Sequence, residues 1–228
     1  MKSVKTLSFE PSSSAVRFKL SFGLMAAIWI LGLVGHFTPL QEWPALALYV
    51  LGSIGLVLWR GKAKGEWKET YLAGGDLKKS LKLGIIWGII LLVIALVNTI
   101  FAYKYQDGLK MMSGMEYLLV HRSLLYLFPV LVIAEEFLWR GIMFSALREK
   151  GINKHLIVAI TTLLFVLNHY AVAPVDIKER ALMAMMAFPI GIAGGYLVFF
   201  TKNVWGSVVM HLILMIGMMI ALLVNIPA

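Results

Sequence analysis

Cysteine is absent from this chain of 228 residues. Without cysteine the chain can form no disulfide bond and has no thiol nucleophile. The zinc-protease signature HExxH and the serine-hydrolase signature GxSxG are also missing. These absences exclude a cysteine protease and argue against the common zinc and serine hydrolases.

Acidic residues are scarce as well. Twelve aspartates and glutamates oppose 21 lysines and arginines, which gives a formal net charge of +9. Because 60% of the residues are hydrophobic and the mean hydropathy is +0.84, the composition is typical of an integral membrane protein. In such a protein an excess of positive charge usually reflects lysine and arginine held on the cytoplasmic side, so we expect the lipid bilayer and no nucleic acid as a partner.

Long hydrophobic runs fill most of the chain and predict an all-α fold, a polytopic membrane helix bundle of about seven transmembrane helices. We expect Pro129 to kink the long fourth span. The polar N-terminal tail and the length of the first apolar run indicate a retained span rather than a cleaved signal peptide. The predicted spans are Phe18–Phe37, Trp43–Trp59, Leu83–Tyr103, Tyr117–Phe144, Ile152–Ala173, Ala181–Phe200 and Val204–Ile226.

The basic residues predict the orientation of these spans. With a cytoplasmic N-terminus, 15 of the 21 lysines and arginines fall in cytoplasmic segments and five fall outside. This bias predicts a cytoplasmic N-terminus and an external C-terminus. The basic segment Arg60–Lys82 could hold a helix on the inner membrane surface or could be a solvated loop, and the sequence favours neither.

Three charged residues lie inside the apolar stretch VLVIAEEFLWRGIMF, which runs from Val130 to Phe144. Charges at membrane depth are expensive and usually functional. On a helix, Glu136 and Arg140 are four residues apart, in the favourable order for an ion pair. Glu135 points about 100° away from Glu136, so the same arginine need not neutralise it.

Two histidines also lie within predicted spans. Counted from the basic ends of their spans at roughly 1.5 Å per residue, Glu135, His169 and His211 lie about 20, 22 and 14 Å deep. These depths overlap, so the three side chains could converge in one cavity. A carboxylate beside a histidine can activate a water, and a second histidine can stabilise an oxyanion. The same set could bind zinc or relay protons in a transporter, but we favour a site with no metal and no cofactor.

These residues resemble the motifs of the CAAX protease and bacteriocin-processing (CPBP or Abi) family of intramembrane glutamic endopeptidases. The run from Glu135 to Arg140 is similar to the EExxxR motif, and the run from Phe165 to His169 is similar to FxxxH. His211 resembles the histidine of a third motif. The resemblance predicts a catalytic core in residues 117–228, and it makes 1–116 an N-terminal region with a tail, three transmembrane helices and the basic loop.

The resemblance also implies roles for these residues. It implies that Glu135 and His169 activate the water, that His211 helps form the oxyanion site, and that Glu136 and Arg140 support them. The expected substrate is a membrane-associated peptide or protein. The small size and short loops resemble the bacterial branch, whose members process bacteriocins or give immunity to them, so we expect a multi-pass protein of the bacterial cytoplasmic membrane.

One residue departs from the family pattern. Met215 stands one turn after His211, where the family has an asparagine, and a thioether cannot replace the amide N–H at the oxyanion. We expect Asn168, beside His169, to be a candidate substitute donor. The departure leaves an alternative open, namely a non-catalytic membrane adaptor or bacteriocin-immunity protein that keeps the protease fold.

Overall fold

The computed structural model describes residues 13–106 and 113–225, and within these ranges it contains helices and no strand. The predicted all-α helix bundle is confirmed. Two of the short segments, η2 and η4, are π-helical, and η3 is a 3₁₀-helix. The elements are α1 Ser13–His36, α2 Trp43–Lys64, α3 Leu77–Gln106, α4 Ser113–Glu116, η2 Tyr117–His121, η3 Leu124–Leu127, α5 Phe128–Glu136, η4 Phe137–Met143, α6 Phe144–Glu149, α7 Lys154–Val172, α8 Ile177–Thr201 and α9 Trp205–Asn225.

Five of the described helices are long and apolar enough to cross a membrane: α1, α2, α3, α7 and α8. A sixth span results if the bent pair Ser113–Leu119 and Leu124–Glu149 counts as one. In α9 a shorter apolar stretch, Trp205–Ile220, runs beside α3. The chain is therefore a multi-pass membrane protein by length and composition, and the total of seven spans stays a prediction.

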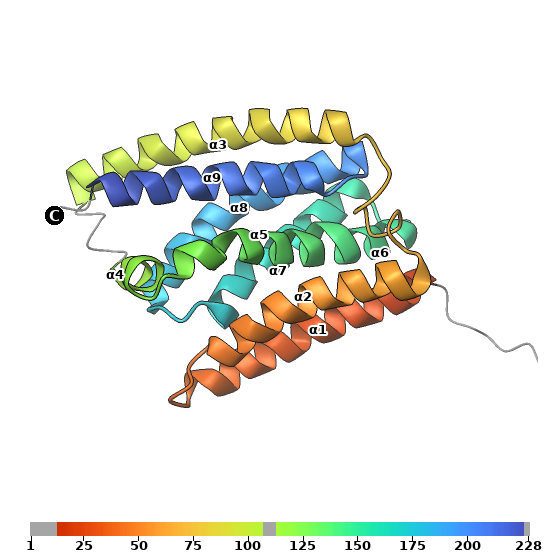
Figure 1. Ribbon diagram of the computed structural model, residues 1–228, viewed down its shortest axis with the longest axis horizontal. Coiled ribbons are helices and arrows are strands. Elements are labelled where there is room, and N and C mark those ends of the chain that lie inside the picture. The colour runs from red at the N-terminus through yellow and green to blue at the C-terminus, as the bar shows by residue number, and fades with distance from the viewer. Residues whose placement is uncertain (1–12, 107–112, 226–228) are drawn as a thin grey trace, which may run out of the picture.

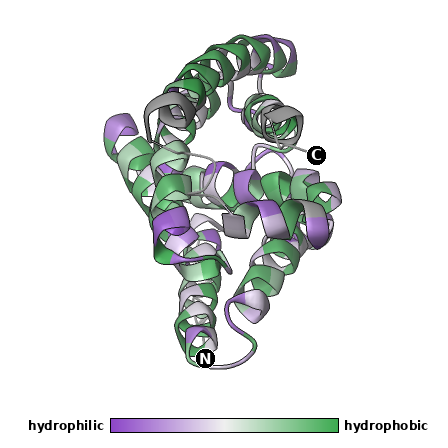
Figure 2. Cartoon of the chain, turned by 90° about the vertical axis from the view of Figure 1, so that its left-hand side faces the viewer, coloured by the Kyte–Doolittle hydropathy of each residue, from purple (hydrophilic) through white to green (hydrophobic). Residues whose placement is uncertain are grey.

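The continuous rod of α5, η4 and α6 forms the centre of the bundle (Figure 1). Every residue from 134 to 147 is buried, although this stretch contains two glutamates and an arginine. Helices α1 and α2 pack on one side of the rod, α7 and α8 pack behind it, and α9 with α3 closes the other side. Most of the helical ribbon is coloured as hydrophobic in Figure 2. The charged segment is thus shielded from lipid by neighbouring helices, as charges at this depth require.

The predicted kink at Pro129 is wrong. The chain bends by 77° between Ser113–Leu119 and Leu124–Glu149, before Pro129 is reached. Ser123 at this break has a left-handed backbone with φ 56°, which ends the preceding helix. Pro129 lies in the first turn of α5, where a missing N–H removes no intrahelical hydrogen bond.

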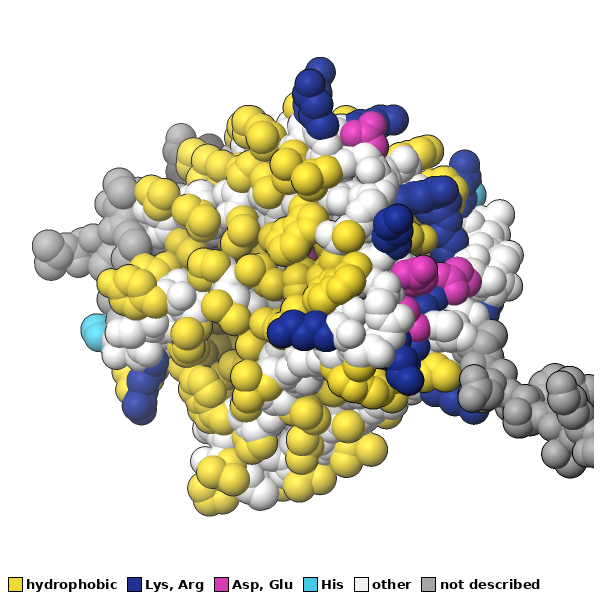
Figure 3. All heavy atoms as spheres, turned by 45° about the vertical axis from the view of Figure 1, so that its right-hand side comes forward, with side chains coloured by type: hydrophobic (Ala, Val, Ile, Leu, Met, Phe, Trp, Pro, Cys, Tyr) yellow, Lys and Arg dark blue, Asp and Glu magenta, His cyan; other side chains and the backbone are white. Residues whose placement is uncertain are grey.

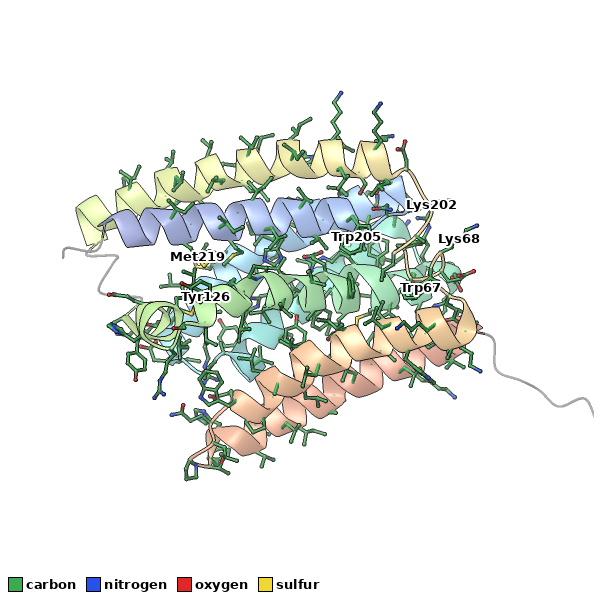
Figure 4. The ribbon with its side chains drawn as sticks, in the orientation of Figure 1. Trp67, Lys68, Tyr126, Lys202, Trp205 and Met219 are labelled. Atoms are coloured by element: carbon green, nitrogen blue, oxygen red, sulfur yellow. The ribbon has the colours of Figure 1, made fainter. Side chains whose placement is uncertain are left out.

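Basic residues gather at one end of the bundle, where α1 and α3 begin and α2 and α8 end. In Figure 3 lysine and arginine cluster over this end, while hydrophobic side chains cover most of the remaining face. Lys68 and Lys202 both lie there, and Tyr126 and Met219 lie toward the opposite end (Figure 4). The cytoplasmic location of this end stays a prediction. Lys2 and Lys5, which were counted on the cytoplasmic side, and Lys110, which was counted outside, lie beyond the described ranges.

The basic segment between α2 and α3 contains turns and no helix between residues 65 and 76. The interfacial helix considered for this segment is therefore absent. The segment folds back onto the bundle, because Thr70 and Tyr71 are buried in it. Trp205 Nε1 donates to the Leu72 carbonyl at 2.9 Å, and Asn203 Nδ2 donates to the Gly74 carbonyl at 3.0 Å.

A buried ionic cluster fastens the same end of the bundle. Glu66 in the loop accepts hydrogen bonds from Arg60 of α2 and lies 3.3 Å from Arg17 Nη1 of α1. Arg17 Nη2 also contacts Glu149 of α6 at 2.5 Å. Burial raises the pKa of Glu66, but hydrogen bonds from Arg60 and Ser13 and the charge of Arg17 outweigh it, so the net pKa is lowered. The Glu66 carboxylate therefore stays charged and joins α1 to α2, and Arg17 joins both to α6 through Glu149.

Glycine permits the close approach of α3 and α9. A methyl group on Gly84 would collide with the Gly206 carbonyl of α9, whereas a methyl group on Gly55 of α2 would meet nothing within 4 Å. Gly84→Ala should therefore lower the stability by about 1–3 kcal/mol through overpacking. Gly55→Ala should be neutral or stabilising by about 0.5–1 kcal/mol, because alanine favours helix.

Thermal unfolding of both variants in the same detergent measures this difference. An unfolding temperature of Gly84→Ala equal to that of Gly55→Ala would show that α3 and α9 are not in backbone contact.

Candidate active site

Glu135 and Glu136 form the last residues of α5, and Arg140 lies in the π-helix η4 that follows. A π-helical turn widens the helix by about one residue and often occurs at functional sites. The hydrophobic residues around this motif bury it within the central rod, where water cannot screen the charges. A fully buried charge there therefore needs partners, either on the rod itself or on a neighbouring helix.

Glu136 has three such partners. Arg140 Nη1 lies 3.3 Å from Glu136 Oε1, so the predicted ion pair is present. His211 Nδ1 lies 3.0 Å from the same oxygen, and Ser207 Oγ donates to Oε2 at 2.6 Å. Because Ser207 and His211 both belong to α9, this carboxylate ties α9 to the central rod.

Glu135 is in a different environment, although it is adjacent in sequence. Glu136 is 0% exposed, but Glu135 remains 7% exposed. Its Oε2 atom lies 3.7 Å from His211 Nε2, too far for a direct hydrogen bond. Within the described part of the chain Glu135 accepts no hydrogen bond. The Glu135 carboxylate is therefore partly exposed and free to accept a hydrogen bond. The ring of His211 lies between the two glutamates.

His169 is held by its own helix. Its Nδ1 atom lies 2.9 Å from the carbonyl oxygen of Phe165. A carbonyl can only accept a hydrogen bond, so Nδ1 carries the proton of the neutral ring. The lone pair is then on Nε2, which faces away from that carbonyl and can accept a proton or a hydrogen bond.

The Phe165 ring lies at the centre of the predicted residues. Its centroid is 5.0 Å from that of His169 and 6.0 Å from that of His211. The Arg140 guanidinium carbon lies 4.4 Å from the same ring, within cation–π range. The structure thus brings together the residues that the three sequence motifs contain.

The two residues considered for the oxyanion position lie at different places. Asn168 is buried, and its Oδ1 accepts a hydrogen bond from Trp29 Nε1 of α1 at 3.0 Å. This contact leaves the amide N–H groups of Asn168 as the available donors. Met215 is half-buried, one turn beyond His211 on α9. The role of either residue at an oxyanion stays a prediction.

The structure adds polar residues that sequence reasoning missed. Ser207 precedes His211 by one helical turn, so the SxxxH spacing could have indicated it. Tyr49 of α2 accepts a hydrogen bond from Trp139 Nε1 at 2.5 Å, and both side chains are fully buried. No local pattern links Tyr49 to Trp139, because 90 residues separate them.

Within residues 13–106 and 113–225 no group of three or more histidine, aspartate or glutamate side chains is arranged to hold a metal ion. His169 and the glutamates do not share a ligand geometry there.

One comparison with known proteins gives a match to a family model over part of the chain. Residues 118–216 match the family model described as type II CAAX prenyl endopeptidase Rce1-like. The match contains all three sequence motifs, and it confirms the predicted resemblance to CAAX proteases. No curated protein and no solved structure gives a significant match to the chain.

Loss of the Glu136 charge should destabilise the fold. Glu136→Gln leaves Arg140 without a counter-ion and removes a charged acceptor from His211, and breaking a buried ion pair costs about 3–5 kcal/mol. We expect a clear drop in the unfolding temperature in detergent. Glu69→Gln, the same change at an exposed loop position, serves as the control and should have little effect. Equal unfolding temperatures would mean that Glu136 does not hold this polar cluster.

Proposed function

From the Rce1-like identity of residues 118–216, we propose that the chain is an intramembrane glutamic endopeptidase. It hydrolyses peptide bonds of membrane-associated peptides or proteins with a water activated by Glu135 and His169. The family match supports a CAAX-type protease, and the glutamic mechanism rests on the geometry of the site.

The main support is the difference between the two adjacent glutamates. Glu136 is fully buried and occupied by Arg140, His211 and Ser207. Glu135 is partly accessible and hydrogen-bonded to none of the described residues, so it has free lone pairs for a water. Structural glutamates are satisfied by fixed donors, whereas a general base needs an exchangeable one.

The proposed reaction starts with a water bound at Glu135. The Glu135 carboxylate removes a proton from this water while the water oxygen attacks the carbonyl carbon of the substrate. The proton then passes from Glu135 to the amide nitrogen, the C–N bond breaks, and a carboxylic acid and an amine leave. The Nε2 lone pair of His169 accepts a hydrogen bond from the other O–H of the water, which keeps its proton, and this bond orients the water oxygen for attack.

His211 is placed to stabilise the developing oxyanion. Its Nδ1 faces the Glu136 carboxylate, which can only accept a hydrogen bond, so Nδ1 carries a proton. When Nε2 also carries a proton, the imidazolium charge lies between two carboxylates and can donate to the oxyanion. Arg140 and an imidazolium at His211 then balance the charges of both glutamates, as a site of low dielectric requires.

A second candidate function is a non-catalytic adaptor or immunity protein that binds a membrane peptide without cutting it. Met215 favours this alternative, since it offers no donor where the family motif has an amide. The polar cluster around Glu136 would be needed for the fold in either case. Cleavage assays decide between the two candidates.

Glu135→Gln should abolish peptide cleavage and leave the protein folded. The amide keeps the size of the side chain but cannot take the proton from water. Purified protein in liposomes is incubated with membrane-anchored peptides, and products are identified by mass spectrometry. Cleavage by Glu135→Gln at the wild-type rate would disprove the role of Glu135 as general base.

The same assay includes a chelator and an inert variant. Addition of 1,10-phenanthroline should leave cleavage unchanged, whereas loss of activity with recovery on added zinc would contradict the metal-free mechanism. Glu69→Gln, on the exposed loop, should cleave as wild type does and controls for handling of the variants.

Met215→Asn should raise the turnover if Met215 faces the oxyanion. A single oxyanion donor is commonly worth about 10²–10³ in turnover, and it acts mainly in the transition state. We therefore expect a higher kcat with little change in KM. A turnover equal to or below that of wild type, with a well-folded variant, would show that this turn of α9 points elsewhere.

A further inference from the structure

Tyr49 is a buried polar residue outside the Rce1-like segment, which begins at residue 118. It lies in the middle of α2 and is 0% exposed. Its phenol oxygen accepts a hydrogen bond from Trp139 Nε1 at 2.5 Å. An indole can only donate, so this contact uses an oxygen lone pair and leaves the proton of the phenol unassigned.

The unassigned proton matters because buried hydroxyl groups are almost always paired on both sides. Within the described ranges no protein acceptor lies within hydrogen-bond distance of the Tyr49 hydroxyl. The phenol proton of Tyr49 therefore needs a water as its acceptor, and that water can pass the hydrogen bond on to a further group.

Two observations direct this proton toward Glu135. Trp139, which holds the phenol, follows Glu135 by four residues on the same rod, so the two residues are about one helical turn apart. Tyr49 also belongs to α2, which packs against α5, the helix whose last two residues are Glu135 and Glu136. Glu135 is also the glutamate that keeps free lone pairs and a small exposed area.

We propose that Tyr49 is a positioning residue for Glu135, with the phenol O–H donating through one bridging water to the carboxylate. Trp139 fixes the phenol, and the phenol fixes one oxygen of Glu135, so that the other oxygen faces the nucleophilic water. The inference rests on the proposed function and extends the site to α2. It makes the N-terminal hairpin of α1 and α2 a working part of the site.

Tyr49→Phe tests the inference, because it removes the hydroxyl and keeps the ring. We expect kcat to fall about tenfold to a hundredfold, the effect of one hydrogen bond to a charged group, with KM changed less than twofold. Tyr71→Phe is the matched control, since Tyr71 is also buried but lies in the loop between α2 and α3. It should leave both kinetic constants unchanged.

A double-mutant cycle distinguishes a role of Tyr49 in positioning Glu135 from a role in stability alone. Tyr49→Phe leaves the indole N–H of Trp139 without an acceptor, so stability alone could lower the activity. Trp139→Phe removes that donor, and the double variant Tyr49→Phe/Trp139→Phe has no stranded group. We expect the double variant to recover unfolding temperature but to remain as slow as Tyr49→Phe.

The outcomes are distinguishable from a failure of the proposed function. If wild type cleaves and the double variant, which has no stranded indole N–H, is as fast as wild type, the phenol serves only the indole and the inference is overturned. Wild-type kcat in Tyr49→Phe overturns it as well. If wild type and Glu135→Gln both cleave nothing, the proposed function fails and the inference fails with it.

Discussion

The buried carboxylate of Glu136 is the interaction on which the polar interior depends. It is surrounded by apolar helices, it is the ion-pair partner of Arg140, and it accepts hydrogen bonds from His211 and Ser207. Without it, a guanidinium and an imidazole would face a medium that cannot solvate them. Attachment of α9 to the central rod is therefore partly electrostatic, and the orientation of His211 follows from this attachment.

The same arrangement separates two adjacent glutamates into different roles. One helical step turns Glu136 toward Arg140 and α9, and it leaves Glu135 7% exposed, with no hydrogen-bond partner among the described residues. The imidazole of His211 contacts the Glu136 carboxylate at 3.0 Å and lies 3.7 Å from the Glu135 carboxylate. Because the Glu136 carboxylate holds Nδ1 of His211, the Nε2 atom keeps a fixed position near the Glu135 carboxylate. Support and chemistry are thus coupled through one ring.

Much of this arrangement could be predicted from the sequence because its signals are local. Apolar runs gave the long helices, the four-residue spacing gave the Glu136–Arg140 pair, and span depth indicated that His169 and His211 could approach the glutamates. The bend before Pro129 was missed, because the break depends on the backbone at Ser123 rather than on the proline. Contacts such as that of Tyr49 with Trp139 depend on the rotation of each helix about its axis, which cannot be read from a segment that is apolar on all sides.

The interior of the molecule crosses the boundary of the Rce1-like segment. Trp29 of α1 donates to Asn168, and Tyr49 of α2 accepts from Trp139, although both aromatic residues precede residue 118. If α1 and α2 were absent, a buried amide oxygen and a buried indole N–H would lose their partners in the bilayer, where water cannot replace them. The N-terminal hairpin therefore completes hydrogen bonds that the matched segment cannot complete alone, and the shape of the site depends on both parts of the chain.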